Sequence, residues 1–467
     1  MSAPSTADLG YRTQNPATGE VEKQFDTATD EQIQQALEKS QKAYQEWSKR
    51  PMSERAAIVK KVASLFTERR KELAQLAARE MGKPANEGSG EARFCDAIFS
   101  YYADNGEELT KDQVVKDIDG QKAVIERLPI GPLLGIMPWN YPYYQVARFA
   151  APNLVLGNTI ILKHAEICPQ SALAIQQIMD DAGVPEGVYQ NVFATHDQIS
   201  TIIADPRIQG ISLTGSERAG ASVAEQAGRH LKKVVLELGG SDPYVVLSAE
   251  DPKAAAEEAL AIRLENTGQA CNSNKRMIVM DDIYDDYVAG LVEKAKAVKP
   301  GDPLNPQEGT YGPLSSEAAA NALVEQIEDA VKNGATLHAG GKRVDGPGYY
   351  VEPAVLTGVT KEARAYYEEL FGPAAVVYQV TSDEEALELA NDTPFGLGGA
   401  VFATEDGRAE KLASKLQVGM ANANAYAAEG AEMPFGGVKR SGYGRELGPL
   451  GMEEFVNKRL YYVVDED

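Results

Sequence analysis

The sequence PLLGIMPWN (residues 132–140) opens a series of five short apolar runs that decides the fold of this chain. The other four are NTIILKHAE (158–166), QNVFAT (190–195), ISLTGSERAG (211–220) and VVLELGGSDP (234–243). Helical stretches separate them, such as SALAIQQIMDDAG (171–183). Because strands that are buried on both faces are continuously apolar, this alternation is typical of a parallel sheet covered by helices. We therefore predict a doubly wound, nucleotide-binding α/β domain.

The alternation continues towards the C-terminus, where a capping box from Ser382 to Glu385 begins one of the helical stretches. It predicts a second α/β unit, with strands in YVVL (244–247), RMIVM (276–280), AVLTGV (354–359), AAVVYQV (374–380) and GAVFAT (399–404).

Three further segments flank these two units. The first hundred residues have a helical pattern, with a capping box at Thr29 and Gln32 and one long amphipathic run over 53–82. Residues 114–131 alternate apolar and polar side chains around Asp119-Gly120, which predicts a hairpin. The C-terminal stretch FVNKRLYYVVDED (455–467) is β-prone with a charged tip and is suited to pairing with another chain.

Composition limits the classes of function. With 467 residues and 43 % hydrophobic residues, the chain can bury a large core. Its net charge of −23 argues against nucleic acid or an anionic membrane as the main partner, since both are bound by basic surfaces. No stretch reaches the roughly 18 to 20 apolar residues of a membrane helix, and no secretory signal is visible. Cys95, Cys168 and Cys271 fit neither a zinc site nor a disulfide framework, so we expect a reducing, cytoplasmic location.

Cys271 is the first candidate for chemistry. It lies in NTGQACNSNKR (266–276), after a glycine turn and before a segment that we expect to be helical. Backbone N–H groups at such a position lower the pKa of a thiol and favour the reactive thiolate. The alternative is a small buried hydrophobic residue, which is the usual state of a free cysteine.

Two polar residues stand at strand ends. Glu237 is the single acid in VVLELGG, and burial there would raise its pKa towards the range of a general base. The alternative is an acid paired with a lysine or a backbone donor. Asn140 follows its strand in a Pro-Trp turn, where its amide can donate to a developing oxyanion. A turn-forming asparagine is the alternative.

Other strand ends are suited to a cofactor. Lys163 and Glu166 can reach sugar hydroxyls, and the N–H groups of Ser216 and Glu217 can face a phosphate at a helix start. Solvated loop residues are the alternative. The pattern G-x-G-x-x-G is absent. With four histidines in the chain, we predict neither a metal site nor a Cys–His dyad.

Taken together, these segments resemble the NAD(P)-dependent aldehyde dehydrogenase superfamily. The resemblance runs from NPATGE (15–20) to PFGGVKRSGYGREL (434–447). It rests on six tags in the family's order and at similar spacing: PWN, the lysine of LKHAE, LTGS, LELGG, GQAC and ELFGP.

The resemblance implies two doubly wound parallel-sheet domains plus a small β oligomerisation element, assembled as homodimers or homotetramers. The expected boundaries are 1–112 and 128–238 for the NAD-binding domain, 239–442 for the catalytic domain, and 113–127 and 443–467 for the oligomerisation element.

The resemblance also implies a mechanism. Cys271 attacks an aldehyde to give a thiohemiacetal, Asn140 and the Cys271 N–H hold the oxyanion, and hydride passes to the nicotinamide. Glu237 then activates water to hydrolyse the thioester, so we expect hydrolysis rather than acyl transfer to coenzyme A. The residues implied at the cofactor site are Trp139, Lys163, Glu166, Gly215, Ser216, Glu217, Leu238 and Glu369.

Glu166 sharpens the cofactor prediction. The position lies where family members contact the adenosine ribose, and close relatives often carry a serine there. A carboxylate accepts both ribose hydroxyls but repels the extra phosphate of NADP. We therefore predict NAD as the preferred cofactor, with NADP as the alternative.

Within the family, the closest resemblance is to short-form bacterial succinate-semialdehyde dehydrogenases. Tyr144 and Arg148 lie four apart on a predicted helix, and Arg148 can bind a distal carboxylate bidentately; the alternative is an arginine that ties the helix to the core. Glu265 stands six residues before Cys271, where some of these enzymes carry an arginine. It would oppose an anionic substrate unless it pairs with Arg148 or points away.

We therefore expect oxidation of succinate semialdehyde to succinate. The first alternative is the same chemistry on a neutral, aromatic or amino aldehyde, which Glu265 would suit better. Two alternatives from other classes are a non-catalytic binding protein with this fold and a thioesterase that needs no cofactor.

Overall fold

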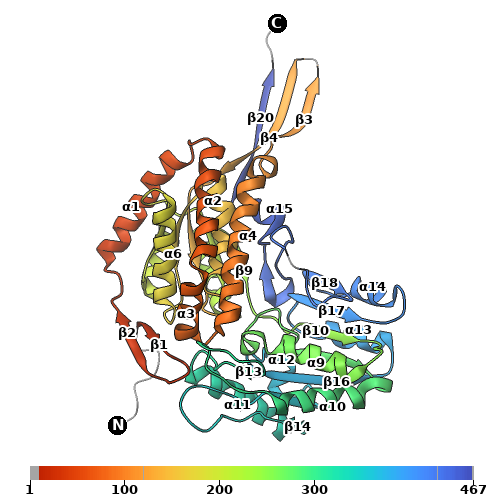
Figure 1. Cartoon of the computed structure of the whole chain (residues 1–467). Helices are drawn as coiled ribbons and strands as arrows, with labels where there is room; N and C mark the ends of the chain where they lie inside the picture. Colours follow the sequence, from red (N-terminus) through yellow and green to blue (C-terminus); the bar gives the residue numbers. More distant parts are fainter. Residues whose placement is uncertain (1–9, 119, 429, 465–467) are drawn as a thin grey trace.

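The computed structural model of the protein describes residues 10–118, 120–428 and 430–464. The chain forms two large sheets with helices on both faces, and a three-stranded sheet that projects from the body (Figure 1). Asp119 of the predicted hairpin turn and the charged tip at 465–467 lie outside the described residues, as does the start of the chain at 1–9.

The first large sheet has six strands in the order β19-β9-β8-β5-β6-β7, all parallel except β19, which is antiparallel to β9. Its strands are β5 (Pro132–Ile136), β6 (Thr159–Lys163), β7 (Tyr189–Asn191), β8 (Gly210–Thr214), β9 (Lys233–Glu237) and β19 (Gly442–Tyr443). The helices around it are α1 (Asp30–Trp47), α2 (Met52–Glu68), α3 (Arg70–Met81), α4 (Ala85–Leu109), α5 (Tyr144–Leu156), α6 (Pro169–Ala182), α7 (His196–Ala204), α8 (Glu217–Arg229) and α15 (Gly448–Met452).

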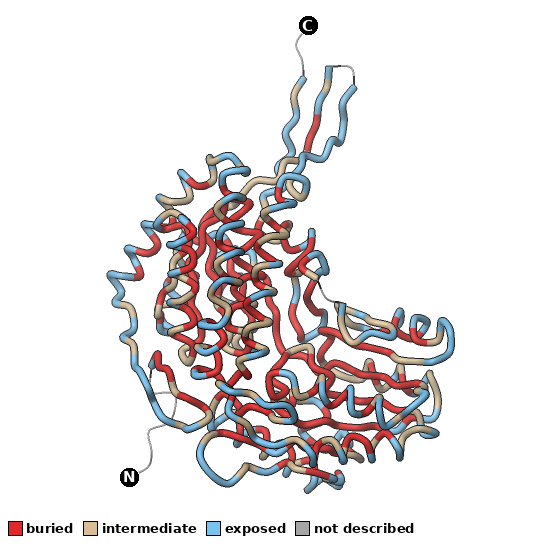
Figure 2. Tube along the Cα trace, viewed as in Figure 1, coloured by how far each residue is buried: buried red, intermediate tan, exposed pale blue. Residues whose placement is uncertain are grey.

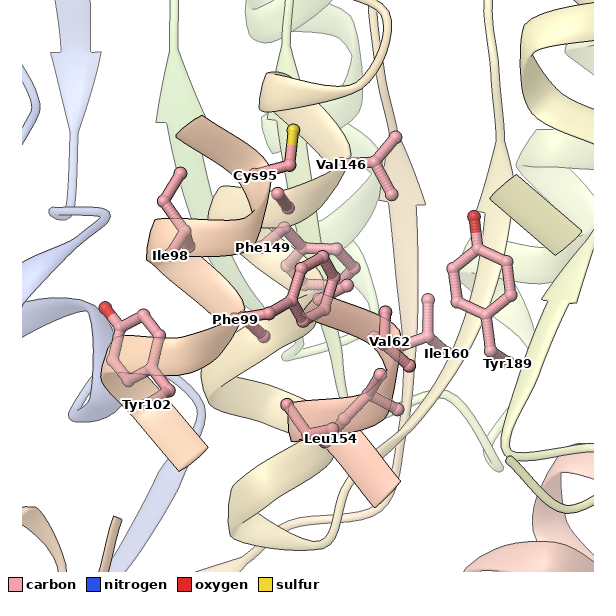
Figure 3. Close-up of a cluster of buried hydrophobic side chains, with 14 of the residues drawn as sticks. Val62, Cys95, Ile98, Phe99, Tyr102, Val146, Phe149, Leu154, Ile160 and Tyr189 are labelled. Carbon is pink, nitrogen blue, oxygen red and sulfur yellow. The ribbon is translucent and has the colours of Figure 1, made fainter. Parts of the chain in front are cut away.

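Neighbouring residues of its strands face opposite helical layers, because side chains alternate across a strand. On β6, Ile160 packs with Phe99 and Cys95 of α4 in the core drawn in Figure 3. The next residue, Ile161, packs with Ile199 of α7 on the other face. Burial on both faces explains the continuous apolar runs of the sequence (Figure 2). The predicted doubly wound architecture is confirmed.

The second large sheet has seven strands in the order β14-β15-β16-β11-β10-β17-β18, all parallel except the pair β14–β15. Its strands are β10 (Pro243–Val246), β11 (Arg276–Met280), β14 (Thr336–Ala339), β15 (Ala354–Thr357), β16 (Ala374–Val380), β17 (Gly398–Phe402) and β18 (Met420–Ala423). One face packs against α9 (Pro252–Arg263) and α10 (Asp281–Ala297). The other packs against α11 (Glu317–Lys332), α12 (Arg364–Tyr367), α13 (Asp383–Asn391) and α14 (Arg408–Ala413).

The projecting sheet consists of β3 (Gln113–Ile118), β4 (Gln121–Pro129) and β20 (Val456–Val464), all antiparallel. The predicted hairpin is therefore confirmed, and the C-terminal strand pairs with β4 of its own chain. The remaining short elements are β1 (Tyr11–Gln14) with β2 (Val21–Phe25), β12 (Lys299–Pro300) with β13 (Thr310–Tyr311), and the 3-10 turns η2 (Glu265–Gly268) and η3 (Lys439–Ser441).

Local signals have mixed outcomes. Thr29 and Gln32 form the predicted capping box at the start of α1, and Ser382 caps α13. Glu385 completes no box, since its carboxylate accepts from Thr381. The long helical run predicted over 53–82 is two helices, because the backbone leaves helical geometry at Arg69 (φ −93°, ψ 6°). The first hundred residues also contain the strands β1 and β2, which the helical pattern did not predict.

Candidate active site

The candidate residues of the first sheet converge because its strands are parallel neighbours. The carboxyl ends of β6, β5, β8 and β9 lie along one edge and carry Lys163, Asn140, Gly215 and Glu237 respectively. In open α/β sheets, ligands bind at this edge. From β9 the chain continues through Gly239 and Gly240 into β10, so the same edge faces the segments that lead into the second sheet.

Glycines allow the motifs to approach closely. A Cβ on Gly240 would lie 2.4 Å from the carbonyl oxygen of Cys271, so only glycine lets the LELGG turn pack against the cysteine. Gly268 has φ +77°, and a Cβ there would lie 2.3 Å from the carbonyl oxygen of Gly372 in ELFGP. Three tags that are far apart in sequence therefore meet at one place.

The turn before Cys271 has an unusual backbone. Asn266 (φ 48°) and Thr267 (φ 55°) both adopt the left-handed region, which costs of order 1 kcal/mol or more for a residue with a side chain. Hydrogen bonds compensate. Glu87 of α4 accepts from the Asn266 N–H (2.7 Å), and the Thr267 hydroxyl donates to the carbonyl of Gly312 (3.1 Å).

Cys271 corrects two sequence-based expectations. No helix follows it; a turn leads directly into β11. Its half-buried thiol has a pKa raised to about 11, mainly by burial, although Arg148 and Lys275 act in the opposite direction. The prediction of a pKa lowered by a helix start is therefore wrong for this structure.

Glu237 is buried, and neither of its carboxylate oxygens has a hydrogen-bond partner among the described residues. Burial raises its pKa well above the usual value, the neighbouring Glu446 raises it further, and Arg148 opposes both effects. Gly436 lies directly against the carboxylate, since a Cβ there would be 2.6 Å from Oε1. The expectation of a raised pKa agrees with this environment, and the alternative of a paired acid does not.

Asn140 connects the two sheets. Its side-chain amide donates to the carbonyl of Gln269 (3.0 Å), and its own carbonyl accepts from the Asn266 amide (2.8 Å). The loop after it is fixed by Glu91 of α4, which accepts from the backbone N–H groups of Tyr143 and Tyr144 (2.8 and 2.9 Å). Asn140 and the Cys271 turn are thus held against each other.

Arg148 lies in a buried cluster of charged and aromatic side chains. Its guanidinium is fully buried, with Nε 2.8 Å from a carboxylate oxygen of Glu446, and it lies over the rings of Tyr144 (4.6 Å) and Phe435 (4.3 Å). The Nη2 of this guanidinium donates a hydrogen bond to the side-chain oxygen of Gln145. Among the described residues, neither Nε nor Nη1 has a hydrogen-bond partner, and Nη1 has no ion-pair partner either. The bidentate contact with a substrate carboxylate therefore stays a prediction, beside the alternative of an arginine that ties the helix to the core.

On the cofactor side, Lys163 is buried and pairs with Glu166, whose side chain is 40 % exposed. Burial alone would raise the pKa of Glu166, but Lys163 brings it below its usual value, so the group is a carboxylate. Trp139 packs edge-on against Phe371 (5.7 Å), which joins PWN to ELFGP.

Other predicted cofactor residues line the same edge. Ser216 caps α8, and Glu217 in its first turn pairs with Arg440. The N–H of Gly215 donates to the Glu237 carbonyl (2.9 Å), and that of Leu238 to Ser441 (3.0 Å). The set of a buried ammonium, a capped helix start, a Trp–Phe wall and carboxylates fits a dinucleotide.

Glu265 lies at the rim of this region. It is exposed, and its charge acts on Glu87, Tyr141 and Tyr426.

Sequence reasoning missed Lys275 and Glu446. Lys275 is buried, and its ammonium contacts the carbonyl of Cys271 (2.8 Å) and Oε1 of Glu369 (3.1 Å). A lysine immediately before an apolar strand was the available signal. Glu446 is buried beside Arg148 and accepts from Ser212 (3.3 Å); nothing in GRELG distinguishes it from a surface acid.

Within the described ranges, no group of three or more His, Cys, Asp or Glu side chains is arranged to hold a metal ion. No described helix combines the length and apolarity needed to span a bilayer.

Similarity to known proteins extends over nearly the whole chain. The sequence profile of the aldehyde dehydrogenase family matches residues 4–460. A protein of Deinococcus radiodurans named succinate-semialdehyde dehydrogenase, NADP(+), is 52 % identical over 450 residues, covering 96 % of this chain and 94 % of that one. One of the same name from Mycobacterium avium is 40 % identical, with 96 % of each chain covered.

Solved structures agree. The succinic semialdehyde dehydrogenase of Streptococcus pyogenes in complex with NADP+ has a TM-score of 0.93 at 41 % identity, covering 98 % of this chain and 100 % of that one. The succinate-semialdehyde dehydrogenase of Burkholderia pseudomallei has a TM-score of 0.93 at 34 % identity, covering 98 % and 95 %.

Proposed function

We propose, since this chain belongs to the aldehyde dehydrogenase family, that it oxidises succinate semialdehyde to succinate with NAD(P) as the hydride acceptor. The observation that carries the proposal is the common neighbourhood of three groups: Cys271 and Glu237 both act electrostatically on Arg148, and the Asn140 amide bonds to the Cys271 turn at Gln269. Gly240, three residues after Glu237, packs against the Cys271 carbonyl. A thiol, an amide donor and an unpartnered carboxylate are the groups that acyl chemistry on an aldehyde requires.

In the proposed mechanism, the Cys271 thiol releases its proton to solvent water, and the thiolate sulfur bonds to the aldehyde carbon, whose C=O electron pair moves to the oxygen, which forms a thiohemiacetal. The Asn140 amide and the Cys271 N–H hold the oxyanion. A dinucleotide held by Trp139, Lys163 and Glu369 would supply the hydride acceptor that this oxidation requires. Glu237 then takes a proton from water, whose oxygen bonds to the acyl carbon. The carbon–sulfur bond breaks to release the acid, and the leaving thiolate takes up the proton held by Glu237.

For the cofactor, we propose that Glu166 gives a preference for NAD over NADP. Its low pKa keeps it charged beside the buried Lys163, and a carboxylate there disfavours a ribose phosphate. This would distinguish the chain from the relatives whose names specify NADP(+).

For the substrate, the names of the relatives support succinate semialdehyde. We propose that the Nη1 of Arg148, the one guanidinium nitrogen without a hydrogen-bond or ion-pair partner in the described residues, contacts the distal carboxylate through a single N–H. Tyr144, whose ring lies under Arg148, forms part of the same wall. A neutral or amino aldehyde is the second candidate, favoured by Glu265 at the rim.

One experiment tests these proposals together. The rate of cofactor reduction is compared for NAD and NADP with succinate semialdehyde, butyraldehyde, benzaldehyde and an aminoaldehyde. We expect NAD-linked turnover of succinate semialdehyde that Cys271→Ala abolishes. Turnover of only an uncharged or cationic aldehyde would contradict the proposed substrate. No turnover with any combination of aldehyde and cofactor would contradict the proposed activity.

Two variants refine the result. Glu166→Ser should shift the kcat/KM ratio towards NADP by about tenfold, which equals ~1.4 kcal/mol; an unchanged ratio contradicts the role of Glu166. Arg148→Met is made together with Glu446→Gln, so that no buried charge is left unpaired. Its KM should rise for succinate semialdehyde far more than for butyraldehyde, and equal increases would mean that Arg148 only ties α5 to the core.

The assembly is also part of the proposal. The projecting sheet exposes Val114, Val115, Leu460 and Tyr461, which supports a homodimer or homotetramer built through 113–127 and 443–467. We propose 1–112 with 128–238 as the cofactor domain, 239–442 as the catalytic domain, and the cytoplasm as the location.

A further inference from the structure

Lys275 is a buried cation between two functional segments. Its side chain is 1 % exposed and follows the cysteine turn, directly before β11. The ammonium contacts the carbonyl oxygens of Ala270 (2.6 Å) and Cys271 (2.8 Å), and Oε1 of Glu369 (3.1 Å). All three of its N–H donors therefore have an acceptor.

The neighbouring cation behaves differently. Arg276 points away from the cysteine and donates to the carbonyls of Leu389 (2.7 Å) and Ala390 (3.3 Å) at the end of α13. Of these two cations, it is Lys275 that joins the cysteine turn to the loop that carries Glu369. Burying an ammonium is costly unless it is paired and hydrogen-bonded, so the contact is specific rather than incidental.

Glu369 lies on the opposite side of the ammonium. Its Oε1 also accepts from the Gly240 N–H (3.2 Å), and a Cβ on Gly239 would lie 2.5 Å from its Oε2. One carboxylate is thus held by both the cysteine turn and the LELGG turn. Phe371, two residues further along, packs against Trp139 and lies 5.9 Å from the Lys275 ammonium.

We propose that Lys275 is a positioning residue that couples the cofactor carboxylate Glu369 to the Cys271 turn, so that dinucleotide binding and thiol reactivity depend on each other. The inference rests on the proposed function, which places Glu369 at the cofactor and Cys271 at the substrate.

The direction of the coupling follows from charge. Glu369 offsets the field of Lys275 at the thiol. When the ribose hydroxyls of a dinucleotide donate hydrogen bonds to the Glu369 carboxylate, this carboxylate offsets less of the electrostatic field of Lys275. The thiolate form of Cys271 is then favoured. The other groups that act on the thiol are Arg148 on α5, Asp242 before β10, and the phenols of Tyr144 and Tyr426.

The test measures alkylation of Cys271 by iodoacetamide across pH, with and without saturating NAD, and uses Cys271→Ala as the blank for the buried cysteines. In the wild type, NAD should increase the thiolate fraction at a fixed pH below the thiol pKa by about fivefold or more. By reciprocity, the Kd for NAD should fall by the same factor when the thiol ionises.

Lys275→Met should abolish this dependence and weaken NAD binding, whereas Lys275→Arg should retain part of it. Lys296→Met, which removes an exposed cation from α10, is the matched control and should behave as the wild type. Near-UV circular dichroism confirms folding, and Lys275→Arg keeps the test decisive if Lys275→Met does not fold.

Two failures are distinguishable. A wild type that oxidises aldehydes, with the same NAD effect on Cys271 in Lys275→Met, overturns the coupling alone. A wild type without NAD(P)-linked aldehyde oxidation overturns the proposed function.

Discussion

The cysteine and the glutamate of the candidate site are held in opposite ways. The turn that leads to Cys271 donates a hydrogen bond to Glu87 and accepts hydrogen bonds from Asn140 and Lys275, and two of its residues keep a left-handed backbone. Glu237, at the end of β9, has a fixed backbone but a carboxylate with no hydrogen-bond partner in the described part of the chain.

Under the proposed function, this difference matches two tasks. A sulfur that must meet a carbonyl carbon needs a fixed position, since small displacements of reacting atoms cost large factors in rate. A base that must accept a proton from water needs a free lone pair, and an unpartnered buried carboxylate keeps one available at the cost of stability.

The largest effect on turnover should come from removing the Cys271 thiol, the group whose position is fixed. Cys271→Ala is expected to lower kcat by at least about 10⁴-fold, because loss of a catalytic nucleophile removes the whole covalent path. The measurement is steady-state cofactor reduction. Cys168→Ala, a buried cysteine at the start of α6, should retain activity; equal loss in both variants would contradict the assignment.

Glu237→Gln should separate the thiol step of the reaction from the hydrolysis step. We expect steady-state turnover to fall by about 10²–10⁴-fold, because hydrolysis loses its base. The first turnover should survive as a burst of reduced cofactor equal to the enzyme concentration, seen by stopped-flow absorbance. Glu225→Gln on the exposed face of α8 is the control. Disappearance of the burst would place Glu237 in the thiol step instead.

Asn140→Ala should have a smaller effect, of about 10²–10³-fold on kcat, as for other oxyanion donors. Part of this loss would come from the missing contact with Gln269. Alkylation of Cys271 distinguishes the two causes: if its rate is unchanged, the turn is intact and the loss belongs to the oxyanion. Asn333→Ala on the surface should not alter either rate.

The smallest effect concerns stability and pH. Burial raises the pKa of Glu237, so the folded protein binds its proton more tightly than the unfolded chain. The part of the free energy of unfolding that comes from this tighter proton binding is fully present below about pH 4.5, the pKa of Glu237 in the unfolded chain. It is lost as pH rises through the raised pKa of the folded protein.

Glu237→Gln, which cannot ionise, should therefore match the wild type near about pH 4.5 and exceed its Tm as pH rises, by roughly 2 °C for each kcal/mol. Thermal denaturation of both proteins between about pH 5 and pH 9 measures this. A Tm difference that does not change with pH would show that Glu237 is charged or paired.

The comparison also shows what the sequence could predict. Asn140, Lys163 and Glu237 could be predicted to lie at one edge of the sheet because each stands at the end of an apolar run, and parallel strands bring their carboxyl ends together. The environment of Cys271 was not predictable in this way. Nothing local indicates that Asn266 takes a left-handed backbone, because that geometry depends on Glu87, which lies on a helix far earlier in the chain.

The same limit applies to Arg148. Helical spacing correctly placed it over Tyr144. Its pairing with Glu446 joins α5 to the C-terminal region, and no pattern within either segment records the other. Tertiary contacts of this kind decide whether a cation is available to a substrate.

The segment from Phe435 to Gly448 has a consequence for biosynthesis. It supplies the strand β19 beside Glu237, the carboxylate that neutralises Arg148, and the carbonyl that receives the Tyr102 hydroxyl of α4. Translation makes this segment after the thiol, the amide and the carboxylate of the site. A nascent chain therefore carries these groups unassembled until residues 435–448 have been made and can fold against them.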